Sequence, residues 1–171
     1  PGPLFRADAS TIDANRLRSV DLGRHGISGD RPIVLAHLDS EDHLPLARDL
    51  IQAHAFWRTR GLQVDLVFVD EHATGYFDEI QRQLREMIRN FFELDLLDRP
   101  GGVFIRNVAH LTVDDQILLR TSACCEFHGN RGILLEQVNL LEAQPPFSNP
   151  IPASRKTVDR YARLASDSSS P

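Results

Sequence analysis

Polar and ionisable side chains occur in this sequence at the points where short apolar runs end. Several of them are carboxylates or imidazoles, which can bind a sugar, a phosphate or a metal ion. The candidates for such a ligand-binding rim are Asp39, Ser40, Glu71, His72, His110, His128 and Arg131, accompanied by Asp70, Asn107 and Asn130. The alternative interpretation is that these residues only provide the caps and turns that surface loops need.

Other reactive residue types lack the spacing that their chemistry requires. Cys124 and Cys125 are adjacent, which seldom allows a structural disulfide, and we interpret them as small buried apolar residues rather than as a thiol nucleophile with a histidine base. Ser28 is not part of a nucleophile elbow, because that motif needs a strand before the serine and a helix after it. No H-x-x-x-H or C-x-x-C spacing occurs. The sequence therefore predicts no catalytic residue, no metal site and no cofactor.

Three glycines, Gly23, Gly26 and Gly29, recur at a spacing of three and suggest a phosphate-binding loop at first sight. A dinucleotide fingerprint needs its glycines after a strand, where they open a helix whose amide groups face the phosphate. Here the glycines precede the apolar run instead. We expect Gly26 and Gly29 to form tight turns that bring the N-terminal arm across a sheet.

Four apolar runs alternate with segments of helical periodicity. Strands are expected between residues 32 and 39 and at 64–69, 102–106 and 123–127, and helices at 44–57, 76–91, 112–119 and 133–141. Residues 8–20 have helical composition with only three apolar anchors. Because the connections are too long for hairpins, we predict a three-layer α/β fold with an about four-stranded parallel sheet, similar to flavodoxin and Rossmann folds. The carboxyl ends of its strands would bring the rim residues together.

The predicted helix at 44–57 carries two further candidates on its apolar side. Trp57, followed by Arg58, could stack on a sugar ring, although at this helical position it more often belongs to the core or to a domain interface. His54 is expected to be a hydrogen-bonded core residue rather than a ligand.

Composition limits the classes of protein to consider. The chain has 171 residues, of which 42% are apolar and 25% charged, which is typical of one globular domain. Its net charge of −5 does not favour nucleic-acid binding, and no apolar run approaches the ~18 residues of a membrane span.

We divide the chain into an N-terminal arm at 1–30, an α/β domain at 31–143 and a Pro-rich linker and tail at 144–171. The first residue is not Met, so we interpret the chain as a piece of a longer protein.

Three stretches of the chain resemble one internal segment of the cyclic β-1,2-glucan synthases. The motifs are Gly26-Ile27-Ser28-Gly29-Asp30-x-Pro32-Ile33-Val34-Leu35, then Ala53-His54-x-x-Trp57-Arg58-x-x-Gly61-Leu62-x-Val64-Asp65-Leu66-Val67, and then Asp98-Arg99-Pro100-Gly101-Gly102-Val103-Phe104. The resemblance spans roughly residues 15–136. It departs from the family's pattern at Cys124-Cys125-Glu126, where aliphatic strand residues are expected, and in the loop at 70–76.

The resemblance implies a parent enzyme at the bacterial inner membrane that transfers glucose from UDP-glucose and adjusts chain length by phosphorolysis. This segment has no D-x-D pair for a nucleotide-sugar metal and no Q-x-x-R-W acceptor motif. We therefore expect an accessory, non-catalytic domain, soluble and on the cytoplasmic side, that docks on other domains of the synthase. The alternatives are a module that binds β-1,2-glucan and a small enzyme with its site at the strand ends.

Overall fold

The computed structural model describes residues 5–71, 77–91 and 96–142, so the predicted linker and tail at 144–171 lie outside the described part. Its centre is a four-stranded sheet, and all neighbouring strands are parallel. The strands are β1 (Ile33–Leu38), β2 (Asp65–Asp70), β3 (Val103–Asn107) and β4 (Ala123–His128). The predicted α/β class and the four strands are confirmed, each within a residue or two of its expected position.

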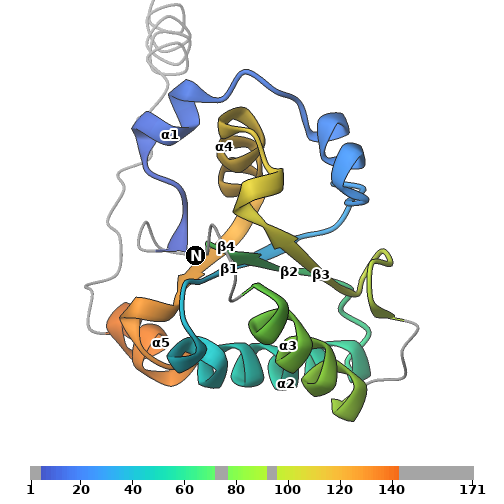
Figure 1. Ribbon diagram of the computed structural model, residues 1–171. Coiled ribbons are helices and arrows are strands. Elements are labelled where there is room, and N and C mark those ends of the chain that lie inside the picture. Colours follow the sequence, from blue (N-terminus) through green and yellow to red (C-terminus); the bar gives the residue numbers. More distant parts are fainter. Residues whose placement is uncertain (1–4, 72–76, 92–95, 143–171) are drawn as a thin grey trace, which may run out of the picture.

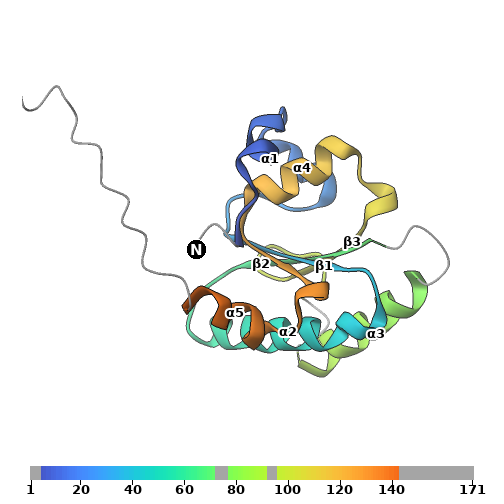
Figure 2. The same cartoon turned by 90° about the vertical axis from the view of Figure 1, so that its left-hand side faces the viewer.

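Helices cover both faces of the sheet and complete three layers (Figures 1 and 2). One face carries α2 (Leu44–Thr59), α3 (Phe77–Phe91) and α5 (Leu134–Glu142). The other face carries α4 (Val113–Ser122), with α1 (Ala9–Ala14) and the 3₁₀ helix η2 (Ser19–His25) beside it. Among the described residues, no helix combines the length and apolar character needed to cross a membrane.

The order of the strands places a reversal of chain direction beside β1. The sheet runs β3-β2-β1-β4, so α2 and α3 carry the chain outward along one face before α4 returns it over the opposite face to β4. The carboxyl ends of β1 and β4 therefore flank the point where the winding direction changes. In open parallel sheets this is the usual position of a ligand crevice.

Two apolar cores lie on the two faces of the sheet because strand side chains alternate. Leu35, Val67 and Phe104 face the α4 layer, where they pack with Leu118 and Leu119. Val34, Phe68 and Ile105 are in the core of the other face, together with side chains of α2 and α3. β2 is buried along its whole length, as strands covered on both faces are.

The N-terminal segment is part of the α4 layer. Leu22 and Ile27 are fully buried in its core. Gly26 and Gly29 both have φ of +73°, which confirms the tight turns expected there. The predicted helical segment at 8–20 is helical only in the short α1 and in the first residues of η2. Between them Asn15 is extended, and its side chain accepts a hydrogen bond from the Leu17 amide.

Candidate functional site

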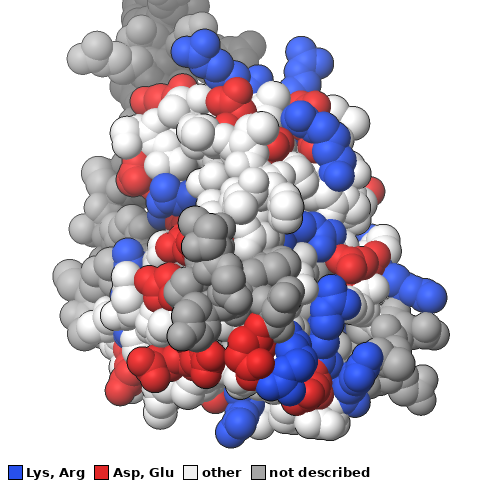
Figure 3. Space-filling view, viewed as in Figure 1, with Lys and Arg blue, Asp and Glu red and all other residues white. Residues whose placement is uncertain are grey.

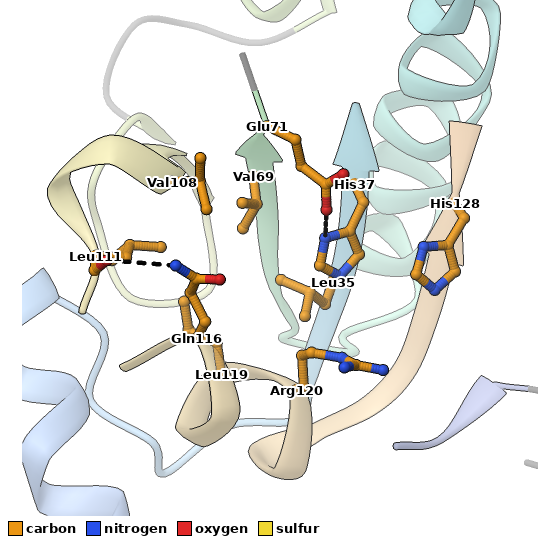
Figure 4. A pocket seen from close by; sticks show the side chains of 10 residues that line it. All are labelled: Leu35, His37, Val69, Glu71, Val108, Leu111, Gln116, Leu119, Arg120 and His128. Atoms are coloured by element: carbon orange, nitrogen blue, oxygen red, sulfur yellow. Dashed lines mark hydrogen bonds and ion pairs between the residues drawn. The ribbon is translucent and has the colours of Figure 1, made fainter. Parts of the chain in front are cut away.

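A pocket of about 330 Å³ lies over the carboxyl ends of β1 and β2, beneath the α4 layer (Figure 4). Its walls come from three strands, from α4 and from the connection between β3 and α4. The lining residues are Leu35, His37, Val69, Glu71, Val108, Leu111, Gln116, Leu119, Arg120 and His128. The pocket thus has an apolar wall on one side and a group of ionisable side chains on the other.

His37 is at the centre of the ionisable side. Its Nδ1 is 2.8 Å from Oε1 of Glu71, and its Nε2 is 2.8 Å from Oε1 of Glu126. Arg120 on α4 approaches the same Glu126 oxygen with its Nε at 2.7 Å. Because Glu126 has only 4% of its side chain exposed, this carboxylate depends on His37 and Arg120 for compensation of its charge.

The strand register explains why these side chains meet. His37 is paired with Val69 of β2 on one side and with His128 of β4 on the other. Residues two apart on a strand share a face, so Glu126 and His128 point to the same side as His37. The imidazole rings of His37 and His128 stack with centroids 4.7 Å apart and an interplanar angle of 9°, at the spacing of neighbouring strands.

The surroundings shift the pKa values of these groups in opposite directions. Burial disfavours charge on His37, but its hydrogen bonds to Glu126 and Glu71 outweigh burial and raise its pKa above the ordinary value. Burial and the nearby charge of His37 lower the pKa of His128 to about 4. Burial acts to raise the pKa of Glu126, but hydrogen bonds from His37 and Arg120 hold it at about 2.

The pocket therefore combines carboxylates with neighbouring cationic or cation-forming side chains. Glu126 is ionised, His128 is neutral, and the hydrogen bond with His37 also lowers the pKa of Glu71. Arg120 and, in its protonated form, His37 oppose the two carboxylates. Such a site offers hydrogen-bond donors, acceptors and a neutral imidazole next to an apolar wall, which suits a small polar ligand or a cation.

Two of the predicted rim residues, Glu71 and His128, lie in this pocket. Asp39 instead pairs with His43 at 2.7 Å, and Ser40 precedes the short 3₁₀ turn at Glu41–His43. His110 is exposed in the connection after β3. Arg131 lines a separate, smaller pocket, and His72 lies outside the described residues.

Three central residues, His37, Glu126 and Arg120, were not among the sequence-based candidates. The signal that could have found them is a polar residue inside an apolar strand. His37 interrupts the apolar run of β1, and Glu126 stands where the resemblance led us to expect an aliphatic residue. Each residue alone is uninformative. Their side chains meet only because β1 and β4 are neighbours in the sheet.

The cysteines and the candidate residues of α2 lie on the other side of the sheet. The register between β1 and β4 shifts by one residue, so Cys124 has no partner in β1. Both free cysteines are partly buried and pack against the core of the α2 layer. His54 is buried with its Nε2 2.8 Å from the Val64 carbonyl oxygen, which confirms the expected core role. Trp57 packs partly buried against the same core.

An exposed apolar surface lies between α2 and α5. A shallow groove there is lined on α2 by Asp49, Gln52, Ala53 and Phe56, and in and next to α5 by Ile133, Leu134, Leu135 and Val138. Phe56 is 56% exposed and Leu135 63% exposed. We call this set of residues the α2–α5 groove. Figure 3 shows acidic and basic side chains next to one another in the lower helical layer, and among the residues that line the groove only Asp49 carries a charge.

The fold and the pocket define an open, doubly wound α/β domain with a crevice at its switch point. No protein-family model matches the chain. The chain is 29% identical over 139 residues to the cyclic beta-(1,2)-glucan synthase NdvB of Rhizobium meliloti strain 1021. The similarity covers 81% of this chain but only 5% of that synthase, so it is a similarity to one segment of a much longer protein.

Proposed function

We propose that the chain is an accessory, non-catalytic domain of a cyclic β-1,2-glucan synthase at the bacterial inner membrane, and that it docks on another part of that synthase. The similarity to a segment of NdvB supports the relation to a synthase. The enzymatic activity, glucosyl transfer from UDP-glucose, would belong to other domains of the parent.

The observation that carries the docking role is the α2–α5 groove. Large apolar side chains rarely gather on a free surface, and burying them against a partner is worth about 25 cal/mol per Å² of apolar area. Because the similarity covers 5% of NdvB, most of such a synthase lies outside this domain and is available to cover the groove. The occupant we propose is an apolar surface of that same polypeptide.

The state of the pocket supports a non-catalytic role. A general base needs a free lone pair close to the proton that it removes. Both ring nitrogens of His37 face carboxylates, and Glu126 is held ionised by two cationic partners. These contacts leave neither His37 nor Glu126 free to act as a general base, and the pKa of His128, about 4, is too low for efficient proton transfer near neutral pH.

The docking role can be tested with charges placed in the groove. In the full-length synthase that contains this chain, we expect Leu135→Glu combined with Val138→Glu to lower incorporation of glucose from UDP-glucose into β-1,2-glucan. Val113→Glu is the matched control, since Val113 is 71% exposed on the opposite helical layer. In the isolated domain all three substitutions should leave the thermal midpoint nearly unchanged. Equal synthase activity in groove and control variants would rule out docking through this surface.

A second candidate function, binding of β-1,2-glucan, is favoured by the pocket. Its donors and acceptors beside an apolar wall match the polar and C–H sides of a glucosyl unit. An NMR titration of the domain with linear and cyclic β-1,2-glucans, with UDP-glucose and phosphate as controls, tests this role. Saturable shifts at His37, Glu71 and His128 would establish glycan binding, whereas shifts around Trp57 would place the glycan on α2 as the sequence suggested. No shift at millimolar glucan would leave docking as the surviving function.

A further inference from the structure

We propose that His37, Glu126 and His128 form a binding site for Zn²⁺ whose fourth coordination position opens into the pocket. The proposal is independent of the docking role. The sequence predicted no metal site because none of the short ligand spacings occurs; here the donors come from two neighbouring strands.

The three side chains supply a suitable set of donors. Two imidazoles and one carboxylate with an open fourth position are a common ligand set of zinc sites. One ligand atom from each residue lies within 4.8 Å of the other two. Oε1 of Glu126 is 2.8 Å from Nε2 of His37 and 3.7 Å from Nε2 of His128. Because the two imidazole rings stack nearly parallel, binding one ion requires the His128 ring to tilt until its Nε2 lone pair converges with that of His37.

Glu71 provides the outer contact that a metal-binding histidine needs. Such a histidine usually donates its second ring N–H to a carboxylate, which fixes the ring and increases the basicity of the ligating nitrogen. The carboxylate of Glu71 is 2.8 Å from Nδ1 of His37 and leaves Nε2 directed at Glu126. Figure 4 shows this contact on the pocket side of β1.

Arg120 is the group that competes with the ion. Its Nε is 2.7 Å from the Glu126 oxygen that would bind the metal, so the guanidinium compensates the carboxylate in the structure. Zn²⁺ would displace Arg120 from this oxygen and His37 would bind in its neutral form. Arg120 is one-third exposed, which leaves room for it to turn toward solvent.

The open position determines what else can bind. The pocket borders His37 and His128 and is about 330 Å³ in volume, so a water molecule or an oxygen of a small ligand can complete the tetrahedron. With Arg120 nearby, the Zn²⁺ site would have excess positive charge and would favour an oxyanion or a hydroxyl oxygen.

The test is isothermal titration of the EDTA-treated, untagged chain with Zn²⁺ at about pH 8, where protons compete little for the imidazoles. Cys124→Ala combined with Cys125→Ala serves as the background, since thiols bind zinc on their own. We expect a single site in this background, and Co²⁺ bound there should show the visible absorption of a tetrahedral centre. His128→Ala and Glu126→Gln should each lower the affinity by more than about 10-fold, and Glu71→Gln by about 10–100-fold.

Two further variants make the result specific. Arg120→Gln should increase the zinc affinity several-fold, because it removes the competing cation and retains the helix. His110→Ala is the matched control, since His110 is an exposed histidine away from the pocket, and it should leave the affinity unchanged. Circular dichroism confirms that each variant is folded. Failure to bind Zn²⁺ at micromolar concentration, or equal affinity in His128→Ala and His110→Ala, would reduce the cluster to an ion-pair network and overturn the proposal.

Discussion

The ionised side chains of the pocket compensate one another at close range. Glu126 is nearly inaccessible to solvent, and a buried carboxylate without partners would cost several kcal/mol. His37 and Arg120 supply the compensation from β1 and α4, so the network joins two strands and one helix. At this scale the arrangement of charges, rather than any single residue, determines which groups are ionised.

His54 illustrates the opposite case, a histidine kept neutral by burial. Burial lowers its pKa below the ordinary value near 6.5. A histidine whose folded pKa is lowered contributes stability above the unfolded pKa, and this stability is lost as the pH falls through the folded pKa. We expect His54→Gln, which keeps a donor for the Val64 carbonyl, to weaken this loss on acidification.

The measurement is urea unfolding of both proteins at a series of values between about pH 7.5 and pH 5. The difference between the two proteins isolates His54, because the other histidines titrate in both. The wild type should lose up to about 1.4 kcal/mol more per pH unit than the variant in the lower part of this range. Parallel pH profiles would contradict a neutral buried imidazole.

Sequence analysis identified the site residues that lie at strand ends but missed those that lie inside strands. Glu71 and His128 come at strand ends, where a polar residue after an apolar run is informative. His37 and Glu126 lie within strands, and their value as site residues depends on which strands are neighbours. The order of strands follows from long-range packing and not from the local pattern of residues.

Among the helices, α4 contributes three of the side chains that line the pocket. It begins at Thr112, whose hydroxyl accepts from the Asp115 amide at 3.1 Å, while Asp115 accepts from the Thr112 amide at 3.2 Å. This reciprocal arrangement is a capping box with Asp115 in place of the usual Glu or Gln. The cap fixes the start of the helix that carries Gln116, Leu119 and Arg120 into the pocket.

Removal of this cap should be measurable in the free energy of unfolding. Thr112→Ala is expected to destabilise the domain by about 1 kcal/mol, because the Asp115 amide loses its acceptor at the first turn. Thr112→Ser keeps the hydroxyl and should be close to wild type in a urea titration. If serine destabilised the domain as much as alanine, the methyl group rather than the cap would be the important feature.

For the whole molecule, sequence patterns predicted the class of fold well, but they did not predict that side chains of the N-terminal segment are buried in one of its two cores. Apolar runs in β1, β2 and β3 mark buried strands, and helical periodicity in α2 marks the helix that covers them. The role of the N-terminal segment was harder to predict, since the burial of Leu22 and Ile27 depends on a sheet face that only the assembled fold provides. The division at residue 30 between arm and domain stays a prediction.

The position of β4 next to β1 also determines the order in which the strands can pair during synthesis. β1, β2 and β3 follow one another along the chain and can pair as they leave the ribosome, whereas the contact between His37 and Glu126 joins residues 89 positions apart. Closing so long a loop is slow compared with pairing of successive strands. The pocket is therefore completed only after β4 has been synthesised, because a nascent chain that ends before β4 lacks Glu126 and His128.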